Sequence, residues 1–311
     1  MYDLLVIGSG AAGQSAGIYA GRYLLKTILV KGHEWGGETA VASTIENYPG
    51  YLKIDGFELM QKMEEQSKSV GVEMKEGLVT SLKKNTDGTF TALVDGKDEI
   101  QARSVVLATG SRRRRLGMSA EDKLIGKGLS YCTTCDAPLY KGKIVAIIGG
   151  GDSSIKGANL AAEYAEKIYL IVRANKLNGE PVNNQRLMQK KNVEILFETE
   201  VKEILGAERM EGIVLSKEVN GSTTLQLGGL FVEIGAIPNN DLAKELGVEL
   251  DMHGYVEVDP MMKTNIPGVM AAGDLCNETQ GFKQDIVAAS QGSIAATSAY
   301  QHIGNNSIAS Y

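Results

Sequence analysis

The residues best suited to chemistry lie between Tyr131 and Asp136, in the stretch Tyr-Cys-Thr-Thr-Cys-Asp. Cys132 and Cys135 have two residues between them, a spacing that allows a small reversible disulfide. In such pairs one thiol commonly has a lowered pKa, because the neighbouring sulfur and local dipoles stabilise its thiolate. Asp136 follows directly and supplies a carboxyl group that can donate or accept a proton. The stretch therefore predicts a redox-active dithiol.

Two other interpretations of this cysteine pair are half of a zinc site and a purely structural disulfide. Zinc in proteins usually takes four ligands, and the chain offers only four further candidates, Cys276, His33, His253 and His302. We expect Cys276 to be a small buried residue, and the histidines have no partners that suggest a role. A redox pair is favoured, and no metal site is predicted.

Composition narrows the class of protein. The chain has 311 residues, 43% hydrophobic and 23% charged, which is typical of a soluble globular protein with two domains. Its net charge of −6 argues against a general nucleic-acid or anionic-membrane binder. Three cysteines do not form a secreted disulfide framework. With no signal-peptide pattern and no apolar run of membrane-spanning length, we expect a reducing, cytoplasmic location.

A first glycine-rich turn follows an apolar strand that begins near Asp3. Gly8 allows the tight turn, Gly10 lets the backbone approach a pyrophosphate, and Gly13 lets helix and strand touch. Free amides at the start of the following helix would hold phosphate charge. The next apolar strand, Thr27–Val30, ends without the acidic residue that usually binds an adenosine ribose, so a standard NAD pocket is not indicated. The whole turn is Gly8-Ser9-Gly10-Ala11-Ala12-Gly13.

A second turn of this kind, Gly149 to Ser153, follows an apolar strand that begins at Lys143. Between the two turns, the pattern predicts a helix over 56–70, a strand meander, a buried strand before Ala108-Thr109-Gly110, and a linker over 111–120. The linker contains four arginines, Arg112 to Arg115, which form either a solvated connector or a docking patch for an acidic protein.

Near the end of the chain, the stretch Val269-Met270-Ala271-Ala272-Gly273-Asp274 predicts a buried strand that ends in Gly-Asp. A carboxylate at this position can accept hydrogen bonds from sugar hydroxyls. A long helix is predicted from Asp285 to His302, and its N-terminal dipole can polarise a ligand.

Together these motifs resemble the low-molecular-weight thioredoxin reductases over nearly the whole chain. The resemblance implies an α/β fold with two dinucleotide-binding domains, Rossmann-like and three-layered, the second inserted in the first. Residues 1–114 and 246–311 would form a discontinuous FAD domain. Residues 117–243 would form a pyridine-nucleotide-type domain that carries the dithiol. The family is usually a homodimer. The motifs are the first glycine turn, Glu46-Asn47-Tyr48-Pro49-Gly50, Ala108-Thr109-Gly110, Tyr131 to Asp136, Gly149 to Ser153, and Ala272-Gly273-Asp274.

The resemblance also implies residue roles. Cys135 would face the flavin, Cys132 would attack the disulfide of thioredoxin, and Asp136 would exchange the proton of the reacting thiol. The dithiol must then face both a buried flavin and a bulky protein, which implies a large domain rotation. The FAD-binding set would be Gly8, Ser9, Gly10, Ala11, Ala12, Gly13, Gly37, Glu38, Asn47, Ala108, Thr109, Gly110, Gly273, Asp274, Lys283, Gln284 and Asp285.

The electron donor is where the chain departs from the family pattern. Members that use NADPH carry a basic cluster, His-Arg-Arg with a further Arg, just past the second domain's second strand. A 2′-phosphate needs such donors around it. Here the stretch is Val172-Arg173-Ala174-Asn175-Lys176-Leu177-Asn178, which keeps only Arg173 and, as a weak substitute, Lys176. No acidic residue stands there for NADH. The remnant of a nucleotide site would comprise Gly149, Gly151, Asp152, Ser153 and Arg173.

Two donors therefore remain open: NAD(P)H with unusual selectivity, or a low-potential carrier such as ferredoxin that bypasses the nucleotide pocket. The chain resembles a divergent branch that does not use NADPH, and we favour the second donor. The arginine run would suit an acidic ferredoxin, and Trp35, Tyr131 or Tyr311 would be able to cover the flavin. Two hypotheses from other classes are a flavin dithiol oxidase that uses O2 and a non-enzymatic, redox-regulated FAD-binding protein.

Overall fold

The computed structural model describes residues 1–279 and 282–304, and its chain divides into two compact units. Unit 1 comprises Met1–Arg112 and Pro238–Tyr311, and unit 2 comprises Arg113–Ile237. Tyr311, one of the three aromatic residues predicted to cover the flavin, lies outside the described residues. No helix in the described part of the chain is long and apolar enough to cross a membrane.

Unit 1 is built on a seven-stranded sheet with the order β3-β2-β1-β6-β5-β4, and β17 pairs with β6. Strands β3, β2, β1, β6 and β17 are parallel, whereas β5 and β4 continue from β6 as an antiparallel meander. The strands are β1 (Tyr2–Ile7), β2 (Thr27–Val30), β3 (Glu73–Lys75), β4 (Val79–Lys84), β5 (Phe90–Val94), β6 (Asp98–Leu107) and β17 (Val269–Ala271). Its helices are α1 (Ala11–Arg22), α2 (Gly37–Ala40), α3 (Gly56–Ser69), α8 (Asp241–Leu246) and α9 (Asp285–Gly304).

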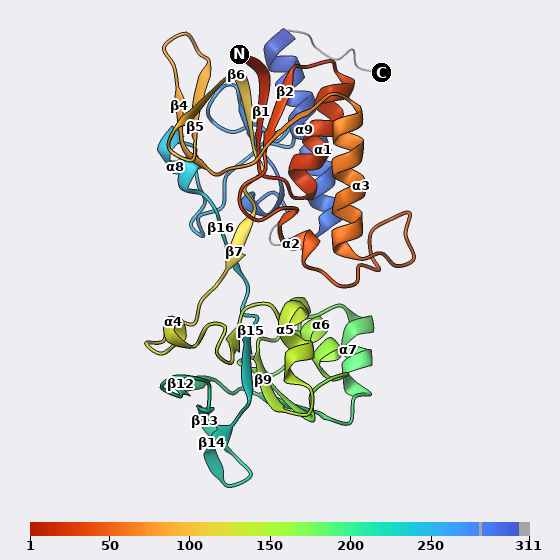
Figure 1. Cartoon of the computed structure of the whole chain (residues 1–311), viewed down its shortest axis with the longest axis vertical. Coiled ribbons are helices and arrows are strands. Elements are labelled where there is room, and N and C mark those ends of the chain that lie inside the picture. The colour runs from red at the N-terminus through yellow and green to blue at the C-terminus, as the bar shows by residue number, and fades with distance from the viewer. Residues whose placement is uncertain (280–281, 305–311) are drawn as a thin grey trace. The chain divides into compact units, whose positions relative to one another are not determined.

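The alternation of side chains along β1 explains the layers of unit 1. Leu4 and Val6 face one core, which they share with alanines of α1 and α9. Leu5 and Ile7 face a second core, with residues of the meander and of α8. Since successive side chains of a strand point to opposite faces, an apolar run is buried on both sides. Figure 1 shows α1, α3 and α9 together on one side of the sheet.

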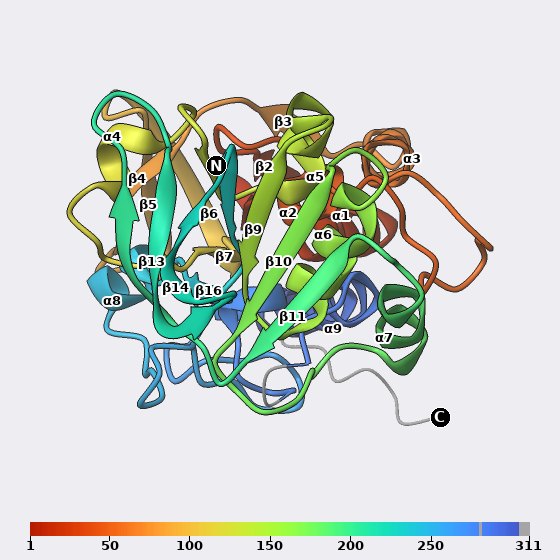
Figure 2. The ribbon, with the colours of Figure 1, turned by 90° about the horizontal axis from the view of Figure 1, so that it is seen from below.

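Unit 2 contains a parallel five-stranded sheet of order β11-β10-β9-β15-β8. Its strands are β8 (Leu129–Ser130), β9 (Ile144–Ile148), β10 (Lys167–Val172), β11 (Val193–Phe197) and β15 (Gly229–Val232). An antiparallel sheet of β12 (Val201–Leu205), β13 (Gly212–Val219) and β14 (Ser222–Gln226) packs on one face. The other face packs against α6 (Asp152–Ala161) and α7 (Pro181–Met188). Figure 2 shows β9, β10 and β11 side by side between these two layers. The short helices α4 (Glu121–Leu124) and α5 (Thr133–Asp136) complete the unit.

The chain connections between the units differ in two respects from the sequence-based expectation. The stretch over 111–120 is not all linker, because β7 (Ser111–Arg113) pairs with β16 (Ala236–Pro238). The chain also returns to unit 1 at Pro238 rather than at 246. The reason is α8, whose Glu245 carboxylate accepts hydrogen bonds from Ser81 Oγ at 2.5 Å and from Leu82 N at 3.0 Å.

Candidate functional site

The dithiol forms a disulfide at the start of the short helix α5. Cys132 and Cys135 are bonded, with their Cα atoms 5.3 Å apart, within the usual range for a disulfide. Cys132 is the N-cap residue, and its Sγ accepts a hydrogen bond from the backbone N–H of Cys135 at 3.2 Å. Cys135 is exposed and Cys132 is partly buried. A sulfur at a helix N-terminus is placed where its thiolate is stabilised.

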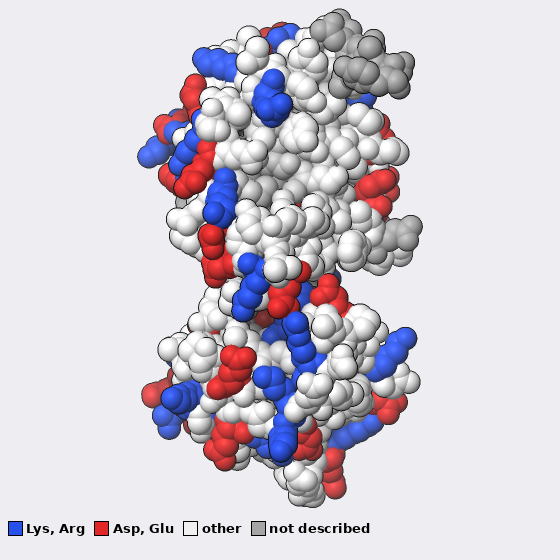
Figure 3. Space-filling model, turned by 90° about the vertical axis from the view of Figure 1, so that its right-hand side faces the viewer, with Lys and Arg blue, Asp and Glu red and all other residues white. Residues whose placement is uncertain are grey.

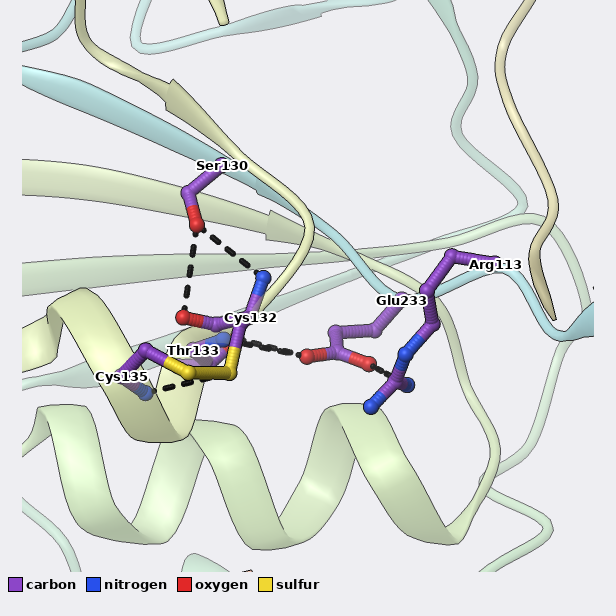
Figure 4. Close-up of a disulfide and its surroundings, with 6 residues drawn as sticks. All are labelled: Arg113, Ser130, Cys132, Thr133, Cys135 and Glu233. Atoms are coloured by element: carbon purple, nitrogen blue, oxygen red, sulfur yellow. Dashed lines mark hydrogen bonds and ion pairs between the residues drawn. A yellow bond between two sulfur atoms is a disulfide. The ribbon is translucent and has the colours of Figure 1, made fainter. Parts of the chain in front are cut away.

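Ser130 and Glu233 hold this turn from two sides (Figure 4). Ser130 Oγ accepts from Cys132 N at 3.0 Å. Glu233 Oε1 accepts from Thr133 N at 3.3 Å and from Thr133 Oγ1 at 3.0 Å. Its other oxygen, Oε2, pairs with Arg113 NH1 at 2.8 Å. The sequence interpretation missed both residues, although a glutamate that ends an apolar strand was a signal that it has a buried partner.

Asp136 lies on the same short helix as the cysteines. Its backbone N–H donates to the Cys132 carbonyl oxygen at 3.2 Å. Burial, assisted by the Asp136 charge, raises the pKa of Tyr140. Asp136 therefore lies on the dithiol turn, and its carboxylate lies near one buried phenol.

In unit 1, the candidate FAD residues gather around the N-terminus of α1. A Cβ on Gly8 would lie 2.1 Å from the Ala108 carbonyl oxygen, and one on Gly13 would lie 1.9 Å from the Gly8 oxygen. Ser9 Oγ accepts from Gly36 N at 3.2 Å. The added Cβ atoms on Gly37 and Gly273 would meet Gly10 at 3.6 Å and Ala12 at 3.0 Å, respectively. Segments far apart in the sequence thus meet at one turn.

The space around Gly10 fits a diphosphate. A Cβ built on Gly10 meets no atom closer than the Gly36 oxygen at 3.9 Å, so the backbone is open at this point. Gly10 is the N-cap of α1 and provides no side-chain acceptor for the first amides of the helix. Exposed N–H groups at the positive end of a helix are suited to phosphate oxygens.

Asp274 fits the sugar chain of the cofactor. Burial raises its pKa, and the charge of Asp285 adds to this effect. Ser111 Oγ donates to its carboxylate at a long 3.4 Å. A desolvated carboxylate with such a weak donor would gain from hydroxyl groups of a ligand. Thr109 and Gly110 directly precede Ser111, and both accept hydrogen bonds from Asn239. Its backbone N–H donates to the Gly110 oxygen at 3.0 Å, and its Nδ2 donates to the Thr109 oxygen at 2.9 Å.

The start of α9 brings together a second part of the predicted set. Asn47 Nδ2 donates to Gln284 Oε1 at 2.9 Å, and Thr39, next to Glu38, donates to Asp285 Oδ1 at 2.6 Å. Lys283 instead donates to the backbone oxygens of Asp274 and Cys276 and lies over the Tyr255 ring at 4.3 Å. The Lys283 ammonium group is therefore already satisfied by contacts within the protein.

The second glycine turn keeps the same shape in unit 2. A Cβ on Gly149 would lie 2.2 Å from the Glu233 carbonyl oxygen, whereas one on Gly151 would meet nothing within 4 Å. Asp152 accepts from Glu180 N at 3.1 Å and pairs with Lys156 at 2.6 Å. Ser153 and Arg173 are exposed. The turn remains a place where a phosphate would fit.

Other predicted residues have structural contacts. Cys276 is 1% exposed, as expected, and burial raises the pKa of its thiol to about 12. Trp35 packs against Phe57 and donates to Glu64. Tyr131 packs on the core of unit 2, with Arg115 6.0 Å from its ring centre. Within residues 1–279 and 282–304, no group of three or more His, Cys, Asp or Glu is arranged to hold a metal ion.

Comparison with known proteins gives these sites a family context. The chain matches the pyridine nucleotide-disulphide oxidoreductase family over residues 2–292. It is 34% identical to the thioredoxin reductase of Peptoclostridium acidaminophilum, with 98% of each chain covered. Among solved structures, the thioredoxin reductase of Lactococcus lactis superposes with a TM-score of 0.92 at 31% identity, covering 98% of this chain and all of that one.

A further solved structure is similar at a lower TM-score. The ferredoxin-flavin thioredoxin reductase of Clostridium acetobutylicum gives 0.53 at 30% identity, with 98% of this chain and 99% of that chain covered. Full-length similarity, a disulfide of the expected spacing and a glycine turn that fits a diphosphate all agree. The chain therefore belongs to the low-molecular-weight thioredoxin reductase family of FAD-containing oxidoreductases.

Proposed function

We propose that this chain passes electrons from reduced FAD through the Cys132–Cys135 pair to the disulfide of thioredoxin or a thioredoxin-like protein. The observation that carries the proposal is the position of Cys132 as the N-cap of α5, where its sulfur accepts the Cys135 N–H at 3.2 Å. Helix N-terminal amides stabilise a thiolate more than a thiol, so Cys132 would be the attacking sulfur.

The exchange conserves electrons and protons. Bound FAD would supply the two electrons and two protons with which the Cys132–Cys135 bond opens to two thiols. The Cys132 thiolate then attacks one sulfur of the partner disulfide, and the partner's other sulfur leaves as a thiolate. Cys135 then loses its proton and attacks the Cys132 sulfur of the mixed disulfide. The Cys132–Cys135 bond forms again, the bond between Cys132 and the partner breaks, and the partner's second sulfur leaves and takes up a proton. Asp136 would take the proton from the attacking thiol and return it to the leaving sulfur.

The FAD cofactor would be held by the residues that meet at α1. Gly8, Ser9, Gly10, Ala11, Ala12 and Gly13 would surround the diphosphate, and Asp274 with Gly273 would bind the sugar chain. Gly37, Glu38, Asn47, Ala108, Thr109 and Gly110 would line the cofactor, with Gln284 and Asp285 at the start of α9. Lys283 would act indirectly, by fixing the Asp274 backbone at 3.2 Å. Bound FAD supplies the two-electron chemistry that these residues lack.

The electron donor would be a low-potential carrier such as ferredoxin, not NADPH. Lys202, and less strongly Arg173, hold the pKa of Glu200 below its usual value. The single arginine that remains of the family's basic cluster therefore lies close to a carboxylate. Glu200 is itself paired with Lys202, so Arg173 alone remains of the arginines in this cluster to meet a 2′-phosphate.

Glu198 lies at the same edge of the sheet, because its backbone N–H donates to the Ala174 oxygen at 3.0 Å. Two acidic residues thus flank a loop that carries one arginine and Lys176. Lys217 and Lys202 pair with these acids, at 3.4 Å and 2.7 Å. The loop over residues 173–178, all of which the structure describes, offers only these two cations to a ligand. This scarcity of positive charge supports a site with poor NADPH binding.

Ferredoxin docking is the proposed role of the arginine run, although two of the four charges are already paired. Arg113 pairs with Glu233 at 2.8 Å and Arg115 with Asp122 at 2.5 Å. Arg112 and Arg114 are exposed and donate to uncharged oxygens. These two would contribute most to attraction of an acidic carrier, since exposed charges mainly raise association rates. The similarity to the ferredoxin-flavin thioredoxin reductase of Clostridium acetobutylicum supports this donor class.

We also infer a homodimer in a reducing, cytoplasmic setting. Asp285 and His302 are the only acidic or basic residues of the 20-residue helix α9, part of which is exposed. In Figure 3 the middle of the visible face of unit 1 is almost free of charged side chains, whereas blue and red are mixed over unit 2. An uncharged face of this kind favours contact with a second copy. Light scattering at micromolar concentration should give twice the chain mass; the mass of a single chain would contradict a homodimer.

Anaerobic bleaching of the flavin tests the donor. NADPH, NADH and chemically reduced ferredoxin are added to the FAD-containing protein in separate runs, and absorbance is followed. Fast bleaching by ferredoxin alone is the expected result. Fast bleaching by NADPH would overturn the proposed donor and leave an ordinary nucleotide-dependent reductase. Fast bleaching by NADH alone would mean altered nucleotide selectivity.

A further inference from the structure

Glu233 joins the dithiol turn to an arginine at the point where the chain enters unit 2. Its side chain is 5% exposed. One carboxylate oxygen accepts from both donors of Thr133, the first residue of α5, and the other pairs with Arg113 (Figure 4). Thr133 is itself 1% exposed. Three polar contacts thus converge on one buried carboxylate directly beside Cys132.

Burial makes this arrangement consequential. A desolvated carboxylate is costly unless charged or polar donors satisfy it, and hydrogen bonds to a charged group are stronger than neutral ones. The contact joins two elements of the fold, because Glu233 directly follows β15 and Thr133 is the first residue of α5. Since α5 has only four residues, its orientation depends on side-chain contacts of this kind.

We propose that Glu233 is a positioning residue of the dithiol. Together with Arg113, it controls how readily the Cys132 thiol loses its proton. The proposal rests on the redox role of Cys132 given above. The sulfur lies one residue before Thr133, so a change of charge at Glu233 or Arg113 acts on it through a partly buried, poorly screened path.

The two partners act in opposite directions. A negative charge beside the sulfur disfavours its thiolate, whereas the arginine favours it. Removing only the Glu233 charge leaves the Arg113 charge in place and should ease loss of the proton from Cys132. Removing only the Arg113 charge leaves the carboxylate and should hinder it. The other charged and titratable groups near this turn are Asp136, Tyr140, Tyr131 and Arg115. These remain the same in each variant and cancel in the comparison.

The test measures alkylation of Cys132 by iodoacetamide from pH 5 to pH 9. The FAD-containing Cys135→Ser protein serves as the background, so that Cys132 is the reacting thiol. Cys276 stays silent, because it is buried and its thiol has a pKa of about 12. At pH 7, Glu233→Gln should react faster and Arg113→Gln more slowly, each by on the order of tenfold.

Matched measurements separate charge from positioning. With both cysteines present, equilibration against glutathione should favour the dithiol in Glu233→Gln and the disulfide in Arg113→Gln. A tenfold change in this equilibrium corresponds to about 30 mV. Hydrogen exchange of the amides of α5 should speed up in Glu233→Ala but not in Glu233→Gln, which keeps an acceptor oxygen for Thr133.

Glu194→Gln provides the control. Glu194 pairs with Lys167 at 2.7 Å. Lys167 is the first residue of β10, so this pair lies at the end of the sheet opposite the glycine turn. This variant undergoes the same chemical change and should leave Cys132 reactivity unaltered. Equal reactivity of Glu233→Gln and Arg113→Gln, or a shift of both in one direction, would overturn the proposal. No donor or thioredoxin is used, so this outcome is independent of the donor proposal.

Discussion

The sulfur of Cys132 accepts a hydrogen bond from the backbone N–H of Cys135 at 3.2 Å, which makes the first cysteine the N-cap of the helix that contains the second. The two sulfurs are therefore not equivalent. The Cys135 N–H points toward the Cys132 sulfur, and its dipole stabilises negative charge on that sulfur once the disulfide is open.

Cys132→Ser should abolish reduction of thioredoxin while leaving FAD bound. Serine is a good N-cap, so α5 keeps its start, and the FAD residues lie in unit 1. Cys135→Ser should instead trap a stable mixed disulfide between Cys132 and thioredoxin, since the resolving thiol is gone. Non-reducing electrophoresis detects the trapped complex. A Cys132→Ser protein that reduced thioredoxin at the wild-type rate would rule out the mechanism.

Gly10→Ala should yield a folded protein that has lost FAD. The new Cβ would meet no protein atom closer than 3.9 Å, so the backbone tolerates it, but it fills the space that a pyrophosphate needs. We expect FAD affinity to fall on the order of a hundredfold, which absorbance and protein concentration measure together. Gly151→Ala is the matched control, because its Cβ also meets nothing within 4 Å and it belongs to unit 2. This control should keep wild-type FAD content, and equal FAD loss in both variants would contradict the assignment.

Ala174→Arg with Asn178→Arg should create NADPH-dependent flavin reduction. Both residues are exposed, so the change costs little stability. Two more guanidinium groups beside Arg173 provide donors for a 2′-phosphate. We expect the ratio of the bleaching rate with NADPH to the rate with NADH to be at least about tenfold higher in this variant than in the wild type. The uncharged pair Ala174→Gln with Asn178→Gln should show no such gain. If the arginine pair gave no NADPH-dependent bleaching, the missing basic cluster would not be the only reason that NADPH is not used.

Glu64 should make the stability of unit 1 depend on pH. Burial opposes its ionisation, but hydrogen bonds from Lys68, Trp35 and Lys31 outweigh this effect and lower its pKa from 4.5 to about 2. A group with a depressed pKa stabilises the fold above its unfolded value of 4.5, and the contribution is lost as pH falls through about 2. From pH 5 to pH 3 the loss should be about 2 kcal/mol.

Trp35, the only tryptophan of the chain, reports this unfolding through its fluorescence in denaturant. Glu64→Gln should lower the free energy of unfolding at pH 7 by about 2 to 3 kcal/mol, and its difference from the wild type should shrink toward pH 3. Glu58→Gln is the control on the same helix, since Glu58 is exposed and forms a surface ion pair with Lys62 at 3.3 Å. A difference that stays constant with pH would contradict the role of Glu64.

Much of the fold was readable from local pattern. The strand over 27–30 and the helix beginning at Gly56 appear at the predicted residues, because apolar runs and helical stripes are properties of neighbouring residues. The glycine turns were readable for the same reason: Gly8 adopts a φ of 111°, and Gly149 a φ of 142°, conformations that side chains disfavour. The spacing of Cys132 and Cys135 alone predicted that they can form a disulfide, and they do.

The boundary at Pro238 and the network around Glu233 depended on residues distant in the chain. Glu245 binds Ser81, and Glu233 binds Thr133, across separations of 164 and 100 residues. No local pattern encodes which carboxylate meets which donor, because the sheet order brings them together.

Residue types and their spacing were enough to indicate a dithiol, two glycine turns and an incomplete basic cluster. The folded chain was needed to show that Cys132 is the helix N-cap, that Lys283 donates to backbone oxygens, and that Glu200 lies close to Arg173. The physical reason is that residue type fixes which reactions are available, whereas burial, hydrogen-bond partners and neighbouring charge are set by packing between distant segments.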